Sequence, residues 1–477
     1  YNIDVTDPLA GTYNEYIWGG LIRDRKWFGF GDSNDSIESA NNWAFLLSMR
    51  KSPRLSWYYN FLKRCKTLDD VFFDTHNIPQ DSPFNENPVK VFKKIGTTVF
   101  KSGWGQNDFV FVMRTGAFFN HQHLDQGSFW LADKRITFIE DQPIHNSDYY
   151  IDPLYQSNFT QPIAHSTILI NHNKQSQRTG DPLNFAPGFN DHAFIDQFLD
   201  TKNAAFSRGD IGRLYWNKVK SLSRNVLFIK PRTLLMLDVA IPGKKDVDVT
   251  LLYHTKYLKD ISASTKISKI TKEGVSLNLV HLSPESISAK AVETPHYLNT
   301  LLKEKPLIKE GMLTVSAHTD GAPLVMANLL TTTKEGIIPD VTSKKGNGFV
   351  SGVASGKKFA FSTKPDSLFK VGDIETNALV ITWDDSYWFV AMATTFRKKG
   401  VTLIESDMPL TFELKGNEIQ YSCSGKGNIL IHADRKPSSV QINGVRIKNL
   451  KYDKVSKTFS IQLSDKSGTI VIDGGKK

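Results

Sequence analysis

The sequence predicts a mainly β protein, with multi-stranded antiparallel β-sandwich domains preceded by the end of an α-helical domain. Helical periodicity occurs only near the start of the chain. From about Val89 onward, apolar residues recur with a period of two in short segments that glycine, proline, asparagine and aspartate separate. No helical pattern lies between these segments, so βαβ units and a parallel sheet are not expected.

The helical pattern runs from Ile37 to Arg64, with apolar residues at helical spacing. Ser33 to Asp35 supply N-cap side chains before it. Pro53 divides it into two helices, because proline cannot continue the hydrogen-bond pattern of a helix interior. We therefore assign residues 1–80 to the end of a helical domain.

The period-two segments predict short strands throughout the rest of the chain. The expected strands are 91–92, 97–99, 109–113, 128–131, 136–139, 167–170, 225–229, 233–239, 247–252, 324–329, 358–362, 378–382, 440–442, 459–463 and 468–472. We divide them between a central antiparallel β-sandwich at 81–335, which would carry the functional site, and a C-terminal β-sandwich at 336–477.

Length and charge narrow the possible classes of protein. The 477 residues suffice for two or three domains. Lysine and arginine number 59 against 49 acidic residues, a net charge of +10, which favours nucleic acid, anionic lipid or acidic polysaccharide as partner. The surplus lies in scattered pairs such as Lys244-Lys245, so charge alone does not choose among these. No apolar run reaches the length of a membrane span, and no signal peptide is present.

The chemistry-bearing residues concentrate between Gly116 and His172. Four of the 12 histidines lie within 45 residues there: His121, His123, His145 and His165. On a strand, His121 and His123 would point to one face. They could then share a metal, or one could bind metal while the other does acid–base work.

Two further residues complete a candidate metal site. Asp141 closes the expected strand 136–139, and His165 opens the expected strand 167–170. If these strands were antiparallel neighbours, His123, Asp141 and His165 would come together, a set that suits zinc or a similar divalent ion. One histidine at a strand end is usually a hydrogen-bonded structural residue, so the combination carries this hypothesis.

The segment from Asn120 to Phe129, NHQHLDQGSF, resembles the HxHxDxGSF signature of heparinase II/III-type polysaccharide lyases. The similarity continues through Asp141 and the tyrosines after it to Ala164-His165-Ser166-Thr167-Ile168. The family usually has His-Asn-Thr there, so Ser166 is a departure. Residues 224–238 resemble the family's second pair of central strands. The resemblance covers about residues 25–260.

The resemblance implies an α/α toroid, a central antiparallel β domain and a smaller β domain. It implies cleavage of uronate-containing polysaccharides by β-elimination, in a periplasmic or secreted bacterial protein, with no nucleic-acid partner. His121 would be the catalytic base or neutralise the substrate carboxylate. Tyr150, or in second place Tyr155, would be the catalytic tyrosine. His123, Asp141 and His165 would bind one divalent ion, commonly zinc.

These groups suit the reaction. A lyase removes the weakly acidic C5 proton of a uronate, so it must neutralise the carboxylate and supply a base with a pKa near neutral. A tyrosine hydroxyl can protonate the leaving oxygen. Asn120, beside the expected base, is a candidate substrate contact.

Other candidates come from the charged and aromatic residues. Arg208, Arg213 and Arg224 could hold sulfate or carboxylate, although a residue on a surface strand is the more common role for each of them alone. Trp130 and Trp216 could stack on sugars, and the core is the more common place for either.

Three other readings compete. A cupin-like metal enzyme would also have a His-x-His pair, but it wants a glutamate where this chain has Asp125 and Gln126. A non-catalytic carbohydrate-binding β protein with a structural metal would have no need of His121. A glycoside hydrolase could pair Asp125 with Asp141, although Asp141 is already assigned to metal.

Lyases of this type usually draw further active-site residues from the toroid, well over a hundred positions before the motif. Only 120 residues precede His121, and two helices cannot close a toroid. We therefore expect an upstream helical segment of the same gene product to complete the site, with this chain alone binding acidic polysaccharide and cleaving it slowly or not at all.

Overall fold

The computed structural model describes residues 21–23, 26–27, 30, 47, 51–62, 77–82, 86–117, 123–140, 153–178, 192–297, 307–447 and 450–474. Across these residues the fold is mainly β, and the strand pairs are antiparallel, as the sequence predicts. No helix among them is long and apolar enough to cross a membrane.

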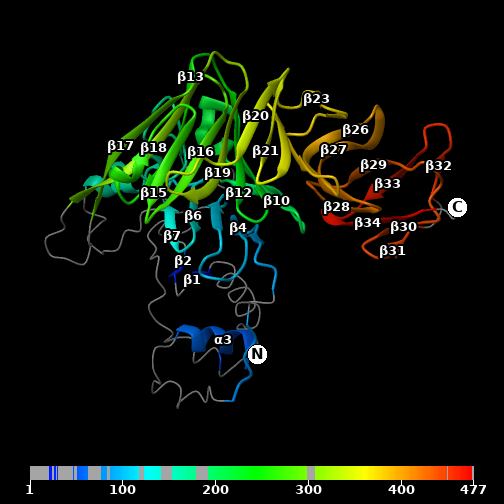
Figure 1. The fold of residues 1–477 in the computed structure, drawn as a ribbon, viewed down its shortest axis with the longest axis horizontal. Helices are drawn as coiled ribbons and strands as arrows, with labels where there is room; N and C mark the ends of the chain where they lie inside the picture. The colour runs from blue at the N-terminus through cyan, green and yellow to red at the C-terminus, as the bar shows by residue number, and fades with distance from the viewer. Residues whose placement is uncertain are drawn as a thin grey trace, which may run out of the picture.

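Helices are few in the described residues. The helix α3 (Pro53–Leu62) begins at the proline expected to divide the helical region, because proline is tolerated in a first turn. It lies apart from the large sheets, beyond β4, β6 and β7 (Figure 1). Most of the expected first helix lies outside the described residues. The short helical segments are η3 (Tyr155–Phe159), η4 (Pro162–Ala164), η5 (Gly212–Lys218) and η6 (Leu258–Asp260).

Three small sheets precede or flank the centre. A two-stranded sheet contains β1 (Leu21–Arg23) and β2 (Lys26–Trp27). A five-stranded sheet has the order β3 (Lys90–Phe92), β4 (Thr97–Lys101), β5 (Val110–Arg114), β6 (Phe129–Asp133) and β7 (Ile136–Ile139). A four-stranded sheet has the order β17 (Ser288–Tyr297), β18 (Leu307–Thr319), β13 (Val247–Thr255) and β8 (Ile168–Ile170).

An eight-stranded sheet forms the centre of the molecule. Its order is β14 (Ile261–Ser262), β15 (Ile267–Lys272), β16 (Val275–Ser283), β19 (Leu324–Lys334), β12 (Thr233–Pro242), β11 (Val219–Ile229), β10 (Ala204–Asp210) and β9 (Phe194–Asp200). One face packs on the five- and four-stranded sheets: Phe228 of β11 stacks on Phe100 and Phe109, with ring centroids 5.6 and 5.5 Å apart.

The other face of the eight-stranded sheet packs on the C-terminal sheet, through residues such as Phe206 and Leu235 against Phe359 and Phe389. Burial on both faces explains why β12 and residues 226–229 at the end of β11 are nearly continuous apolar runs in the sequence.

The C-terminal sheet has fifteen strands among the described residues, all after Lys334, and its far strands lie at the right of Figure 1. They are β20 (Val341–Gly346), β21 (Phe349–Ala354), β22 (Lys357–Ser362), β23 (Phe369–Val371), β24 (Ile374–Thr376), β25 (Val380–Trp383), β26 (Trp388–Lys398), β27 (Val401–Lys415), β28 (Glu418–Cys423), β29 (Gly427–His432), β30 (Ser439–Ile442), β31 (Val445–Arg446), β32 (Tyr452–Asp453), β33 (Thr458–Leu463) and β34 (Ser467–Asp473). The exact domain boundaries stay a prediction.

Candidate functional site

His123 lies in the loop between β5 and β6, not on a strand as the alternation argument supposed. The loop folds back on itself, because the Ser128 amide donates to the Asp125 carbonyl at 2.9 Å and Gly127 has a φ of +83°. Such a φ favours glycine, since it has no Cβ to clash. The Leu124 amide donates to the Thr160 carbonyl at 2.8 Å, which places His123 against the segment before His165.

His165 directly follows η4, and β8 begins only at Ile168. The expected pairing of strands does not occur, because β7 belongs to the five-stranded sheet and β8 to the four-stranded sheet. The two sheets meet at β13 instead: β13 pairs with β8, and the Glu140 amide donates to the His254 carbonyl at 3.3 Å. The ends of β7 and β8 therefore come near each other through β13.

The structure brings His123 and His165 together. His123 Nδ1 lies 3.2 Å from His165 Nε2, and each histidine is only 1% exposed. His165 Nε2 also lies 3.0 Å from the Phe159 carbonyl oxygen. A neutral imidazole has one N–H, so His165 Nε2 can donate to that carbonyl or present a lone pair toward His123, but not both.

The arrangement fits two ligands of one metal ion. Two nitrogens at about 2.0–2.1 Å from a tetrahedral zinc ion are roughly 3.4 Å apart, close to the distance between these two ring nitrogens. The described residues hold no group of three or more metal-binding side chains. The expected third ligand, Asp141, lies outside the described residues, as do His121, Asn120 and Tyr150.

Tyr155 lies beside the histidine pair. It begins η3, is 4% exposed, and turns its ring edge-on to His123, with centroids 6.0 Å apart and an interplanar angle of 82°. From the sequence, Tyr155 is the second candidate for the catalytic tyrosine, after Tyr150. Tyr155 therefore packs against the histidine pair, and because it is buried, little of its side chain is accessible to a polysaccharide.

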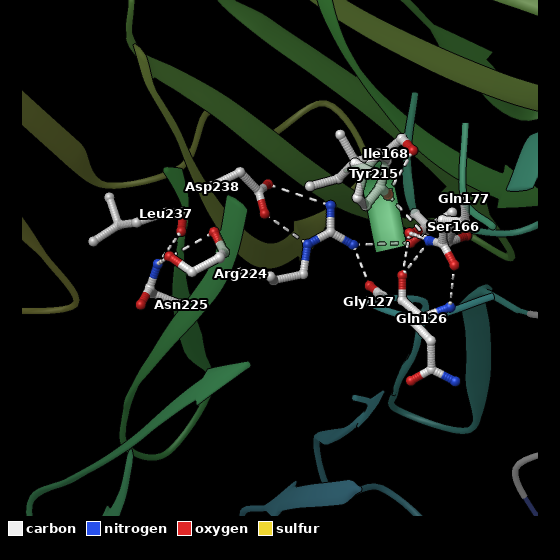
Figure 2. A network of polar contacts seen from close by, with 12 residues as sticks. Gln126, Gly127, Ser166, Ile168, Gln177, Tyr215, Arg224, Asn225, Leu237 and Asp238 are labelled. Carbon is white, nitrogen blue, oxygen red and sulfur yellow. Dashed lines mark hydrogen bonds and ion pairs between the residues drawn. The ribbon is translucent and has the colours of Figure 1, made fainter. Parts of the chain in front are cut away.

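A buried ion pair supports the two segments that carry the histidines (Figure 2). Arg224 and Asp238 are buried, with Nε 2.7 Å from Oδ1 and Nη2 3.3 Å from Oδ2. Arg224 Nη1 donates to the Gly127 carbonyl and, at 2.9 Å, to the Ser166 carbonyl. Burial alone would lower the pKa of Arg224, but the charge and hydrogen bonds of Asp238 raise it, so the guanidinium stays charged. Arg224 is therefore a structural residue and not a contact for sulfate or carboxylate.

A second buried network fixes Gln126 in the same loop (Figure 2). The Gln126 amide donates to Gln177 Oε1 at 3.1 Å, and Gln177 Nε2 donates to the Gln126 carbonyl at 2.7 Å. Gln177 Nε2 also donates to the Tyr215 hydroxyl at 3.0 Å, and that hydroxyl donates to the Ile168 carbonyl at 2.8 Å. Burial raises the pKa of Tyr215 to about 12, so the hydroxyl keeps its proton.

Sequence reasoning missed this second network. Gln177 and Tyr215 lie 51 and 47 positions from their partners Gln126 and Ile168, and nothing in their own neighbourhoods marks them. Ser166, the departure from the family pattern, also has a defined contact: its hydroxyl accepts from the His254 amide at 3.0 Å.

The remaining candidates divide into buried and exposed residues. Arg208, on β10, forms an ion pair with Asp196, and burial lowers its pKa. Trp130 is 2% exposed and belongs to the core, whereas Trp216 is 46% exposed, contrary to the expectation of a core residue.

The fold is similar to that of solved polysaccharide lyases. Heparan sulfate lyase HepC from Pedobacter heparinus matches with a TM-score of 0.51 and 17% identity, over 71% of this chain and 50% of its own. A heparinase III matches with a TM-score of 0.57 and 11% identity, over 76% and 55%. A chondroitin AC lyase from Streptomyces coelicolor matches with a TM-score of 0.50 and 9% identity, over 99% and 66%.

This chain spans about half the length of the two heparin-type lyases. No protein-family model matches the sequence, and no curated protein matches it. The similarity is therefore one of fold: the chain has the β-rich architecture of heparinase III-type polysaccharide lyases.

Proposed function

We propose that this protein is a polysaccharide lyase that cleaves a uronate-containing anionic polysaccharide by β-elimination. The observation that carries the proposal is the buried pair of His123 and His165, 3.2 Å apart, in a fold similar to that of lyases named for heparan sulfate and chondroitin. The net charge of +10 supports an acidic substrate, because a basic surface raises the local concentration of a polyanion. A periplasmic or secreted location is part of the proposal.

We assign the histidine pair, with Asp141, to one divalent ion, zinc in the first instance. When bound, this ion would cross-link the loop after β5 to the turn before β8, as structural metal ions do. His121 is two positions before His123, so a fixed His123 limits where His121 can lie.

In the proposed reaction, His121 takes the C5 proton or faces the substrate carboxylate, and a tyrosine hydroxyl protonates the leaving glycosidic oxygen. The burial of Tyr155 against His123 supports Tyr150 as that tyrosine. Asn120 and Arg208 remain proposed substrate contacts. Arg208 would exchange Asp196 for a carboxylate or sulfate of the polymer.

A direct assay tests the proposal. The protein is incubated with heparan sulfate, chondroitin sulfate, hyaluronan, alginate and ulvan, and the ultraviolet absorbance of the unsaturated uronate product is followed. We expect product from at least one polymer once the expected upstream helical segment is supplied, slow cleavage or none by this chain alone, and none in either case with His121→Ala or Tyr150→Phe. Binding without product from every polymer, even when the upstream segment is supplied, would favour the non-catalytic carbohydrate-binding alternative and reject the lyase. Full activity of His121→Ala would reject the assignment of the base.

A further inference from the structure

An exposed tryptophan occupies an unusual backbone position close to the site. Trp216 interrupts η5 with φ 48° and ψ −135°, a conformation that glycine adopts readily and other residues adopt at a cost. Its side chain is 46% exposed, whereas the preceding Tyr215 is fully buried. Core packing therefore does not account for a large aromatic residue here, and a role on the surface does.

One cationic side chain lies near the ring of this tryptophan, and two lysines lie close to that side chain or to each other. The Arg178 guanidinium lies 5.9 Å from the centroid of the Trp216 ring. Lys218 follows two residues later, and its carbonyl accepts from the amide of Gly243, directly before Lys244. Burial lowers the pKa of Lys218, and the nearby charges of Arg178 and Lys244 lower it further. None of the three cations has a carboxylate partner within the described part of the chain.

Trp216 and its neighbouring cations, called the cluster below, adjoin in sequence the hydrogen-bond network that fixes the loop of His123. Arg178 follows Gln177, and Trp216 follows Tyr215, the two residues whose side chains connect Gln126 to β8. The Arg178 amide donates to the Leu214 carbonyl at 2.9 Å, and Lys218 Nζ donates to the Ser176 carbonyl at 3.1 Å. The backbone beneath the cluster is thus fixed relative to that loop.

We propose that Trp216, Arg178, Lys218 and Lys244 form a binding subsite for an anionic saccharide. A sugar ring stacks on the open face of Trp216, and its carboxylate or sulfate contacts the three cations. Mutual repulsion of unpaired cations is relieved when an anion binds, and a ring of fixed orientation adds selectivity for a sugar over another polyanion. The choice of an anionic saccharide as the ligand rests on the proposed function, and the subsite is where this protein would bind it.

The test separates stacking from charge. Size-defined heparan sulfate and hyaluronan oligosaccharides, and polyglutamate as a polyanion without sugar rings, are titrated calorimetrically into the full chain at constant ionic strength. Trp216→Ala should weaken saccharide binding about tenfold and leave polyglutamate binding within about twofold. Arg178→Ala should weaken the binding of saccharide and of polyglutamate, because it removes a positive charge. Trp216→Phe should retain most saccharide affinity, and Lys454→Ala, an exposed lysine near the C-terminus, should change neither.

A stability measurement guards against a folding defect. Trp216→Gly should unfold at the same temperature as the wild type or higher, because glycine relieves the strained φ, and should still lose saccharide affinity. The subsite is rejected if the wild type binds no saccharide, if Trp216→Ala binds saccharide like the wild type, or if it loses both ligands equally. Product formation in the lyase assay with unaltered binding in Trp216→Ala would reject the subsite and leave the lyase standing. Trp216-dependent saccharide binding without product, in an assay that includes the expected upstream segment, would support the subsite and reject the lyase.

Discussion

Arg224 and Asp238 are direct cross-strand partners on β11 and β12, and their buried ion pair reaches beyond the eight-stranded sheet to both halves of the candidate site. The guanidinium donates to the carbonyls of Gly127 and Ser166. Gly127 belongs to the loop of His123, and Ser166 directly follows His165. One side chain therefore ties the two histidine-bearing segments to two largely buried strands of the eight-stranded sheet.

Replacing Arg224 with methionine should destabilise the protein strongly. The substitution leaves the Asp238 carboxylate buried without its partner and two carbonyls without a donor, which typically costs about 3–5 kcal/mol. Urea unfolding of the two proteins measures this difference. Arg397, which pairs with Glu375 at the surface with both side chains more than a third exposed, is the matched control. Arg397→Met should cost at most about 1 kcal/mol. Equal effects of the two substitutions would contradict this account of the buried pair.

The strands were predictable where one or both faces of a sheet are covered. β12 and residues 226–229 of β11 carry nearly unbroken apolar runs because the eight-stranded sheet is buried on both faces. The prediction missed β17 and β18; β17 has mostly exposed side chains and alternates weakly. It also missed the long hairpin of β26 and β27, whose register shifts break the period of two.

The histidine pair was predictable from its motif, but the reason given for it was wrong. Strand pairing does not bring His123 and His165 together; a loop and a helical turn do, through contacts such as Leu124 with Thr160. Gln177, Tyr215 and the two carbonyl partners of Arg224 could not be predicted, because their contacts join residues 38 to 97 positions apart. Apart from a motif such as the one that contains the histidines, local sequence carries no signal for contacts of that range.

Replacing His123 should remove the proposed metal ion and weaken the fold. We expect His123→Ala to be purified without a stoichiometric divalent ion and to unfold at a lower temperature than the wild type, because metal binding contributes to the free energy of folding. Elemental analysis and thermal unfolding, with and without a chelator, give both readouts. His172→Ala is the control, since His172 is exposed and pairs with Asp248. A wild type without bound ion, or His123→Ala with a full complement, would contradict the metal assignment.

Tyr215→Phe should cost about 1–3 kcal/mol, because it removes the donor to the Ile168 carbonyl and the acceptor for Gln177. If the lyase proposal holds, the same change should also lower turnover by loosening the loop of His123. Tyr253 offers a close comparison: it is fully buried in the same core, and its hydroxyl has no hydrogen-bond partner among the described residues. Tyr253→Phe should leave the free energy of unfolding within about 0.5 kcal/mol of the wild type. Equal losses would show that the network around Gln177 contributes nothing specific.

Lys101 should make stability depend on pH in the alkaline range. This lysine at the end of β4 is 2% exposed, and burial, with a smaller contribution from the charge of Lys90, lowers its pKa from 10.5 to about 7. Between these values the unfolded chain holds a proton that the folded chain does not. Stability therefore rises as the pH rises through this window, by at most roughly 5 kcal/mol. The contact of Nζ with the Trp104 ring, 4.5 Å from its centroid, favours the charged form and reduces the gain.

Lys101→Met removes the titrating group, so it isolates this contribution. The variant should be more stable than the wild type near pH 7, and the advantage should shrink toward pH 9.5, as measured by urea unfolding at both pH values. Other groups titrate in this range as well, but they are common to both proteins and cancel in the difference. Lys370→Met, which changes an exposed lysine on β23, should show a difference from the wild type that does not vary with pH. A difference for Lys101→Met that is likewise constant would mean that Lys101 keeps its charge in the folded protein, held by contacts such as that with Trp104.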